Sequence, residues 1–305
     1  MGAGHTHAHG TATGRHRRRL VAVLAITVSV VGVQVVGGLL SGSLALLADA
    51  GHMLTDATGI AIALTAVSLA GRPATKARTY GLQRAEILAA LANALLLGGL
   101  AVWVIAEAVG RWQDPPEVAT GVMLAAAAAG AAANGVSLLL LRGGQRESLN
   151  LRGAYLEVLG DLVGSVAVIV AGVVIATTGY TRADVIASVL IGLFILPRAW
   201  TLLRQVVDVL LEATPEGIDL DDVRTHIGAV PGVVDVHDLH AWTITSGVPA
   251  LSAHVVVDDD CLDGGRSGEV LDALADCLGE HFDTDHCTFQ LEPVGHARHE
   301  RARHD

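Results

Sequence analysis

Long apolar stretches dominate the first two thirds of the chain. Four of them carry no charged residue over about 20 positions, which lets a helix rising about 1.5 Å per residue cross a hydrocarbon core of about 30 Å. Two more are interrupted by a few polar or charged groups. The six predicted spans are residues 20–40, 44–70, 87–106, 118–141, 162–181 and 185–203. We therefore expect an all-α bundle of six transmembrane helices.

After residue 211 shorter polar and apolar segments replace the long runs. Thr214, Pro215 and Glu216 have the residue types of a helix start, with a cap, a proline in the first turn and an acid beside it. The elements expected to follow are a helix at 219–227, strands at 233–245 and 251–257 joined by a hairpin turn at 246–249, a helix at 267–281 and a strand at 287–291. This α-β-β-α-β order predicts a small two-layer α+β domain.

These patterns divide the chain into four expected segments. A disordered tail rich in His and Arg covers residues 1–19, and the transmembrane domain covers residues 20–204. The α+β domain covers residues 205–293, and a second His/Arg-rich tail covers residues 294–305.

Composition and charge exclude several classes of protein. Hydrophobic residues make up 51% of the chain and charged residues 17%, whereas soluble proteins carry about 25% charge, so a purely soluble enzyme is excluded. Residues 1–204 hold 15 Lys and Arg against 10 Asp and Glu, and residues 205–305 hold 5 against 21. The acidic second part argues against nucleic-acid binding, which needs a basic surface, and fits a domain exposed to water.

The basic residues of the short loops predict the orientation in the membrane, because cytoplasmic loops are enriched in Lys and Arg. One side would carry most of them, namely Arg15, Arg17–Arg19, Arg72, Lys76, Arg78, Arg84, Arg142, Arg146 and Arg204. Both termini are therefore expected in the cytoplasm. The three cysteines, Cys261, Cys277 and Cys287, all lie in the acidic part, which fits a reducing compartment. With the excess of Arg, Ala and Gly, this indicates the inner membrane of a bacterial cell.

Four ionisable residues in or just before the predicted spans form two pairs. His52 and Asp56 are four residues apart, as are Glu157 and Asp161, and residues i and i+4 share a helix face. If residues 150–178 form one span, both pairs lie in hydrophobic helices, where a charge costs at least about 2.5–3.5 kcal/mol. The groups would then face each other, water or a cation. Two helices that each give two ligands make a four-coordinate cage suited to Zn²⁺.

One alternative stays open for these four residues. They could lie at helix ends in the membrane interface instead of around a cation. Asp49 is three residues before His52 on the same stripe, which makes it a further candidate ligand, although the nearby turn at Ser41-Gly42-Ser43 also fits an interfacial position.

At these positions the sequence resembles a known family. Residues 46–56 (LLADAGHMLTD) are similar to the second span of cation diffusion facilitators, the zinc/proton antiporter family. Further similar motifs are Tyr80-Gly81 with Arg84-Ala85-Glu86, residues 150–155 followed by Gly160-Asp161, and segments 231–233, 237–242 and 252–254. The resemblance implies six spans, a cytosolic ferredoxin-like, metallochaperone-like domain, a homodimer in the lipid bilayer, and export of a divalent metal against protons by a transporter that is not an enzyme.

One position departs from the family pattern. Zinc members usually carry histidine where Glu157 stands, so the implied transport site is His52, Asp56, Glu157 and Asp161, one imidazole with three carboxylates. Nitrogen ligands favour Zn²⁺, while carboxylates are more welcoming to harder ions such as Mn²⁺. We expect Zn²⁺ as the substrate, with Co²⁺, Cd²⁺, Mn²⁺ and Fe²⁺ as alternatives.

The resemblance also implies a second metal site in the cytosolic domain. His237 and His254 would lie on neighbouring strands, and Glu292 ends the last strand. His240, His286 and Cys287 are weaker candidates for the same role. The alternative is that these side chains lie on a solvated face of the sheet.

The energy source follows from acid–base chemistry. Metal ligands must lose their protons to bind, so metal and protons compete for one site. The sequence has no Walker motif or phosphate-binding glycine loop, so we expect a proton gradient and no nucleotide. A membrane metal sensor without transport is the alternative from another class. A membrane metalloenzyme is not expected, because the sequence has no HExxH motif.

Overall fold

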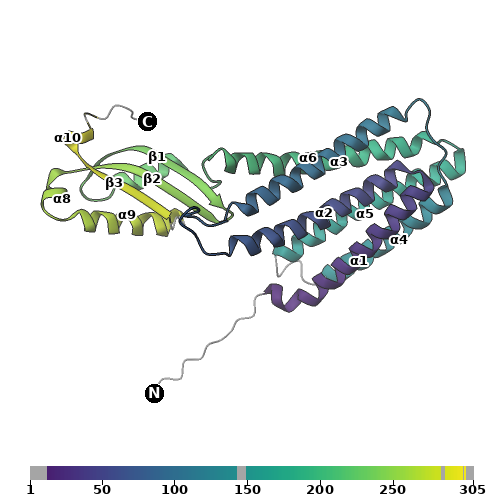
Figure 1. Ribbon diagram of the computed structural model, residues 1–305, viewed down its shortest axis with the longest axis horizontal. Coiled ribbons are helices and arrows are strands. Elements are labelled where there is room, and N and C mark those ends of the chain that lie inside the picture. Colours follow the sequence, from purple (N-terminus) through teal and green to yellow (C-terminus); the bar gives the residue numbers. More distant parts are fainter. Residues whose placement is uncertain (1–11, 143–148, 283–285, 298, 300–305) are drawn as a thin grey trace, which may run out of the picture. The chain divides into compact units, whose positions relative to one another are not determined.

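The computed structural model describes residues 12–142, 149–282, 286–297 and 299. Six long helices come first, each long and apolar enough to cross a membrane. They are α1 (Ala12–Ser41), α2 (Leu44–Ala70), α3 (Ala85–Gly110), α4 (Thr120–Leu141), α5 (Leu149–Thr178) and α6 (Arg182–Leu210), drawn from purple to green in Figure 1. The six predicted spans are thus confirmed. Helix α5 also contains both Glu157 and Asp161, as the pairing argument requires.

The first helix begins earlier than the sequence indicated. We expected residues 1–19 to lack structure, but α1 already begins at Ala12. This part of the prediction is wrong because a helix, once nucleated by the apolar run, extends at little cost through residues that contain no proline. The N-terminal histidines at positions 5, 7 and 9 lie outside the described residues.

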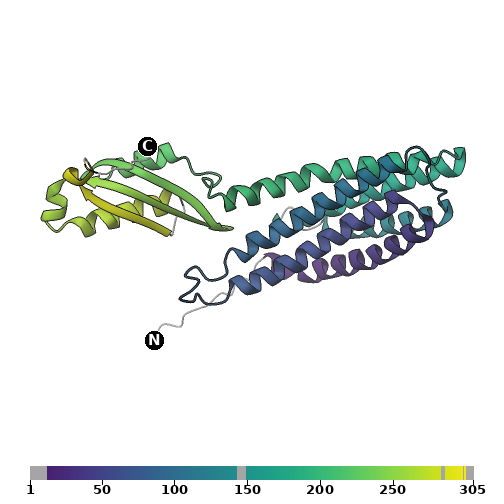
Figure 2. The same ribbon diagram turned by 45° about the horizontal axis from the view of Figure 1, so that its top comes forward.

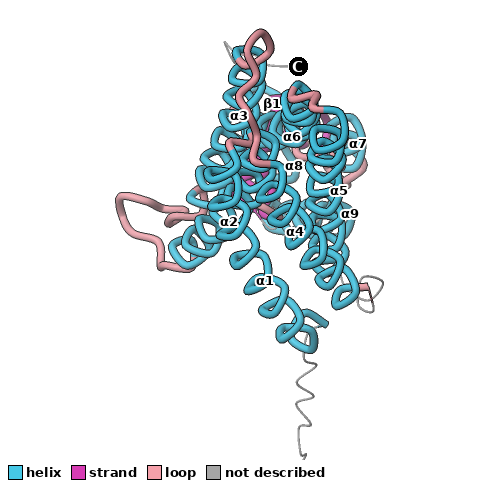
Figure 3. The backbone as a smooth tube through the Cα atoms, turned by 90° about the vertical axis from the view of Figure 1, so that its right-hand side faces the viewer, coloured by secondary structure: helices cyan, strands magenta, loops and turns pink. Residues whose placement is uncertain are grey.

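The chain divides into two compact units, Met1–Ile62 with Ala92–Thr201 and Ala63–Leu91 with Leu202–Asp305. In the first unit, helices α2 to α6 share one apolar core, and α1 packs against α4. Figure 3 shows these helices end-on. Large apolar side chains also cover the outside, including Leu39, Leu40, Val102, Leu139 and Trp200. Such an exterior is suited to contact with lipid.

Asp184 ties the start of α6 to the start of α2. Its carboxylate accepts hydrogen bonds from the Ser43 hydroxyl (2.5 Å) and from the backbone N–H groups of Leu44 (2.8 Å) and Ala45 (3.3 Å). The first N–H groups of a helix have no partner within it, so a buried carboxylate at this point caps α2 from another helix. The sharp turn before α2 is made by Gly42, whose φ is 73°.

The second unit contains a small α+β domain, which confirms the predicted fold class. Its elements are α7 (Leu220–Gly228), β1 (Val233–Thr245), β2 (Val248–Val257), α8 (Asp259–Asp263), α9 (Ser267–Phe282), β3 (His286–Pro293) and α10 (Val294–Ala297). The sheet order is β1-β2-β3, with β1 antiparallel and β3 parallel to β2. Figure 2 shows α7 and α9 beside this sheet, and their apolar residues share a core with one of its faces.

Three local details of this domain differ from the sequence prediction. The helix predicted at 219–227 is α7, which Asp219 caps by accepting a hydrogen bond from the Asp221 N–H, but the helix start indicated at Thr214 is not seen, because Pro215 lies in a turn. The hairpin turn is shorter than residues 246–249, since Val248 already belongs to β2. The short helices α8 and α10 were not predicted.

Candidate metal sites

Three side chains that can bind a metal meet inside the helical bundle. His52 and Asp56 lie one turn apart on α2, and Asp161 lies on α5. The Nε2 atom of His52 is 3.6 Å from Asp56 Oδ2 and 3.9 Å from Asp161 Oδ1. Ligand atoms that bind Zn²⁺ tetrahedrally at about 2.0 Å lie about 3.3 Å from one another. The two distances from His52 are therefore close to the ligand–ligand distance of a tetrahedral zinc site.

The polar atoms of this group fit a cation. All three residues are buried, with 4% to 8% of their surface exposed. Within the described residues, Asp56 Oδ1, Asp161 Oδ1 and His52 Nδ1 have no hydrogen-bond partner. Leaving buried carboxylate oxygens without a partner is costly, and a bound ion removes that cost. One nitrogen and two carboxylates can hold a divalent transition metal.

Glu157 does not join this group. Its Oε1 atom lies 3.0 Å from one terminal nitrogen of Arg198, a residue of α6. The other terminal nitrogen of Arg198 donates to Asp56 Oδ2 at 3.1 Å. One guanidinium therefore connects a carboxylate of α2 with a carboxylate of α5. The metal-binding group consists of His52, Asp56 and Asp161, without Glu157.

Two cavities reach the site from different sides. One, of about 440 Å³, lies between α5 and α6 and is lined by His52, Gly153, Leu156, Glu157, Gly160, Phe194, Ile195 and Arg198. The other, of about 260 Å³, lies among α1, α2 and α5, and Asp56, Glu157 and Asp161 contribute to its lining. The buried ligands thus lie between two spaces through which small ions and water could reach them.

Asp49 lies one turn from His52 but serves a different arrangement. Its Oδ2 atom accepts hydrogen bonds from the Gln34 amide of α1 (2.8 Å) and from the Ser165 hydroxyl of α5 (3.0 Å). A Cβ at Gly164 would overlap the Asp49 carboxylate, so glycine is required there for this close approach. The metal-binding group found in the structure does not include Asp49, which instead joins three helices.

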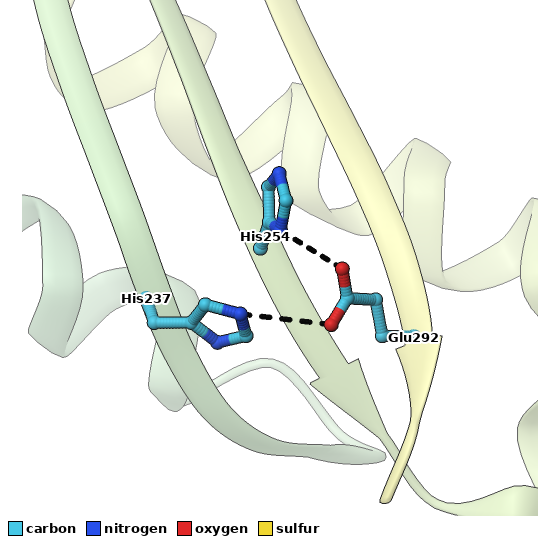
Figure 4. Close-up of side chains that lie close together, drawn as sticks. All are labelled: His237, His254 and Glu292. Atoms are coloured by element: carbon cyan, nitrogen blue, oxygen red, sulfur yellow. Dashed lines mark ion pairs between the residues drawn. The ribbon is translucent and has the colours of Figure 1, made fainter. Parts of the chain in front are cut away.

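A second group lies on the sheet of the C-terminal domain. Figure 4 shows the Glu292 carboxylate between two imidazoles, with Oε1 2.8 Å from His254 Nδ1 and Oε2 3.6 Å from His237 Nε2. His237 and His254 are register partners on β1 and β2. Because side chains alternate along a strand, these residues point away from the face that packs on α7 and α9. The three residues form a group that could hold a metal ion.

The weaker candidates of this domain stay outside that group. His240 is exposed on β1, His286 is exposed at the start of β3, and Cys287 is half-buried against the core. No metal-binding group among the described residues contains any of them.

Comparison with known proteins decides the family. Residues 20–211 match the family described as "Cation efflux transmembrane domain", and residues 215–294 match "Cation efflux protein, cytoplasmic domain". The chain belongs to the cation efflux family. This confirms the resemblance to cation diffusion facilitators, and the six apolar helices make this cation efflux protein a multi-pass membrane protein.

Several relatives match over nearly their whole length. The metal cation efflux system protein CzcD of Cupriavidus metallidurans is 45% identical over 100% of this chain and 94% of its own. The cadmium, cobalt and zinc/H(+)-K(+) antiporter of Bacillus subtilis is 38% identical over 96% of this chain and 93% of its own. The zinc transporter ZitB of Escherichia coli is 40% identical over 94% of this chain and 92% of its own. A solved structure, the metal-bound C-terminal domain of CzcD from C. metallidurans, is 43% identical over 25% of this chain and 99% of its own, with a TM-score of 0.23.

Sequence reasoning missed two functional features of this cation efflux protein. Arg198 gave a signal, since a lone arginine beside Pro197 in an apolar run needs a partner, but its carboxylate partners lie 41 and 142 residues away. Gln34 and Ser165 gave no signal in the sequence, because single polar residues in membrane helices commonly form hydrogen bonds between helices without any further role.

Proposed function

We propose that this protein exports divalent metal cations, above all Zn²⁺, in exchange for protons by alternating access. The observation that carries the proposal is the buried His52, Asp56 and Asp161 group between two membrane helices. The printed names of the relatives, which include a zinc transporter and a cadmium, cobalt and zinc antiporter, support the substrate class.

Proton coupling follows from the ligands. A carboxylate or imidazole binds a metal only in its deprotonated form, so loading with metal releases protons and protonation releases metal. A site that faces the two sides of the membrane in turn exchanges the two. Raising the pH on the loading side should therefore lower the metal concentration that gives half-maximal flux.

We propose Zn²⁺ as the main substrate because the site contains an imidazole and two carboxylates at near-tetrahedral spacing. Co²⁺, Cd²⁺, Fe²⁺ and Mn²⁺ are the alternatives that competition must rank, since selectivity at such ligands depends on geometry as well as on affinity.

We further propose the cellular arrangement. A transmembrane domain of residues 20–204 lies in the bacterial inner membrane with both termini in the cytoplasm, supported by the basic loops on one side. The domain of residues 205–293 lies in the cytoplasm and joins two copies into a homodimer, supported by its match to the cytoplasmic domain of the family.

The test is transport by the purified protein. In proteoliposomes with an acidic lumen, we expect Zn²⁺ uptake that stops when an ionophore collapses the pH gradient. Uptake measured against Co²⁺, Cd²⁺, Fe²⁺ and Mn²⁺ then ranks the metals. Metal binding without any flux would instead support a membrane sensor, and flux without dependence on the gradient would remove proton coupling.

A second metal site is proposed at His237, His254 and Glu292. We expect full-length Glu292→Gln protein to bind one zinc ion fewer per chain than the wild type, because an amide cannot replace the carboxylate that lies between the two imidazoles. Zinc content after equilibrium dialysis measures this. His240→Gln, at an exposed position of β1 three residues from His237, is the control and should leave the zinc content unchanged. Equal zinc content in the wild type and Glu292→Gln would remove the site.

A further inference from the structure

The guanidinium of Arg198 lies within the transport site rather than beside it. One of its nitrogens is 3.1 Å from Asp56 Oδ2, and the same oxygen is 3.6 Å from His52 Nε2. The guanidinium and a bound metal would therefore use one oxygen. The other nitrogen of Arg198 is 3.0 Å from Glu157 Oε1.

In the deprotonated form that binds metal, the charges of the site sum to a definite value. Three carboxylates, Asp56, Glu157 and Asp161, contribute three negative charges, and a neutral His52 contributes none. An arginine side chain stays protonated in proteins, so Arg198 contributes one positive charge. The sum is two negative charges, equal and opposite to one divalent cation.

We propose that Arg198 is an internal counter-cation of the transport site, which neutralises Glu157, keeps it from coordinating the metal and competes with the metal for Asp56. The inference rests on the proposed function and specifies the control of ion affinity at the same site. When a metal enters, the guanidinium gives up Asp56 and remains with Glu157. When the metal leaves, the guanidinium returns to the freed oxygen.

The surroundings of Arg198 allow this movement. Its side chain is 43% exposed and Glu157 is 31% exposed, whereas Asp56 is 8% exposed. Both Arg198 and Glu157 line the cavity of about 440 Å³ that reaches His52. The group that moves when the metal binds or leaves is thus the accessible Arg198 side chain, whereas the metal ligands are buried.

Two other roles make different predictions. Glu157 could be a fourth metal ligand, as the family pattern would imply, with Arg198 as an incidental neighbour. Alternatively, Arg198 could only hold α2, α5 and α6 together. Charge-changing variants at both positions separate these roles from the counter-cation role.

The test is the KM and kcat of Zn²⁺ uptake into proteoliposomes. Arg198→Gln should lower KM at least about tenfold, because the site gains a net negative charge, and should lower kcat, because the ion leaves more slowly. Glu157→Gln should raise KM at least about tenfold, because the guanidinium then neutralises Asp56. The double variant has the wild-type charge and the same three ligands, so its KM should return to within about threefold of the wild type.

Controls keep the outcome clear. Arg204→Gln removes an arginine of the same helix whose only ion pair within the described residues is with the exposed Asp208, and it should leave KM unchanged. Arg198→Lys keeps the positive charge, although an ammonium lacks the planar fork that contacts both carboxylates, and because charge sets KM in this proposal, its KM should stay within about threefold of the wild type. This comparison holds even if Arg198→Gln fails to fold.

Each contrary result overturns the inference in its own way. If Glu157 coordinates the metal, the double variant keeps the raised KM of Glu157→Gln. If Arg198 is only structural, its variants lower kcat and leave KM unchanged. A tenfold fall of KM in Arg198→Lys would refute the role of charge. Absence of flux in the wild type is a failure of the proposed function, whereas normal wild-type flux with a wrong pattern of KM values is a failure of this inference alone.

Discussion

Zinc uptake by proteoliposomes should fall at least about a hundredfold when Asp161 is replaced by alanine, while the protein still folds. Loss of partners that merely orient metal ligands costs about 10- to 100-fold, and Asp161 is one of the three candidate ligands that the described part of the bundle brings together. Its Oδ1 atom has no hydrogen-bond partner among the described residues, so removal of the side chain should leave the packing intact. Uptake under a pH gradient and the thermal unfolding midpoint measure the two parts of this expectation.

Asp208→Ala is the matched control for Asp161→Ala. Asp208 is a carboxylate of α6 that is 54% exposed and pairs only with Arg204 among the ion pairs described, so its loss should leave uptake and folding unchanged. Normal transport by Asp161→Ala would show that the buried group on α2 and α5 is not the transport site.

Replacement of Asp184 by alanine should destabilise the protein by about 3 kcal/mol, since it removes a helix cap and leaves buried donors without an acceptor. The carboxylate holds the Ser43 hydroxyl and two backbone N–H groups at the start of α2. Unfolding of the purified protein in detergent, by heat or by titration with a denaturing detergent, measures the change.

The Asp184 prediction is separable from the transport site. The folded fraction of Asp184→Ala should keep the wild-type KM for zinc, because Asp184 is not among the candidate metal ligands. Asp114→Ala removes an exposed acid from the loop before α4 and should leave stability unchanged. Equal unfolding midpoints for wild type and Asp184→Ala would mean that the cap contributes nothing.

The sequence was sufficient where one physical rule acts along a continuous segment. The six spans follow from the length of apolar runs, and the facing of His52 and Asp56 follows from the period of the helix. The same helix period predicted that Glu157 lies on the same face of α5 as Asp161. It could not predict the ion pair of Glu157 with Arg198, because that pair joins two helices through residues far apart in the sequence.

The C-terminal domain shows the same limit at short range. The β-rich composition predicted β1 to the residue, and the hairpin placed His237 and His254 on neighbouring strands; their direct pairing is seen only in the structure. The helix at 219–227 was predicted to within one residue, but of the two possible start signals, Thr214-Pro215 and Asp219, only the second is used. The acids at Asp221 and Asp222 favour the second through the helix dipole, and the first becomes a turn.

The hydrogen bonds of Asp49 hold the helices around the proposed metal site in register. Gln34 and Ser165 fix the axial register of α1, α2 and α5 by contacts that involve no metal. His52 is one turn along α2 from Asp49, and Asp161 is one turn along α5 from Ser165, so both are aimed at each other in the ion-free protein. The pocket is therefore preorganised, and little binding energy is consumed in ordering the backbone. In the proposed transport cycle, the loaded and the empty pocket would then differ mainly in side-chain positions, which suits a carrier that releases its ion in every cycle.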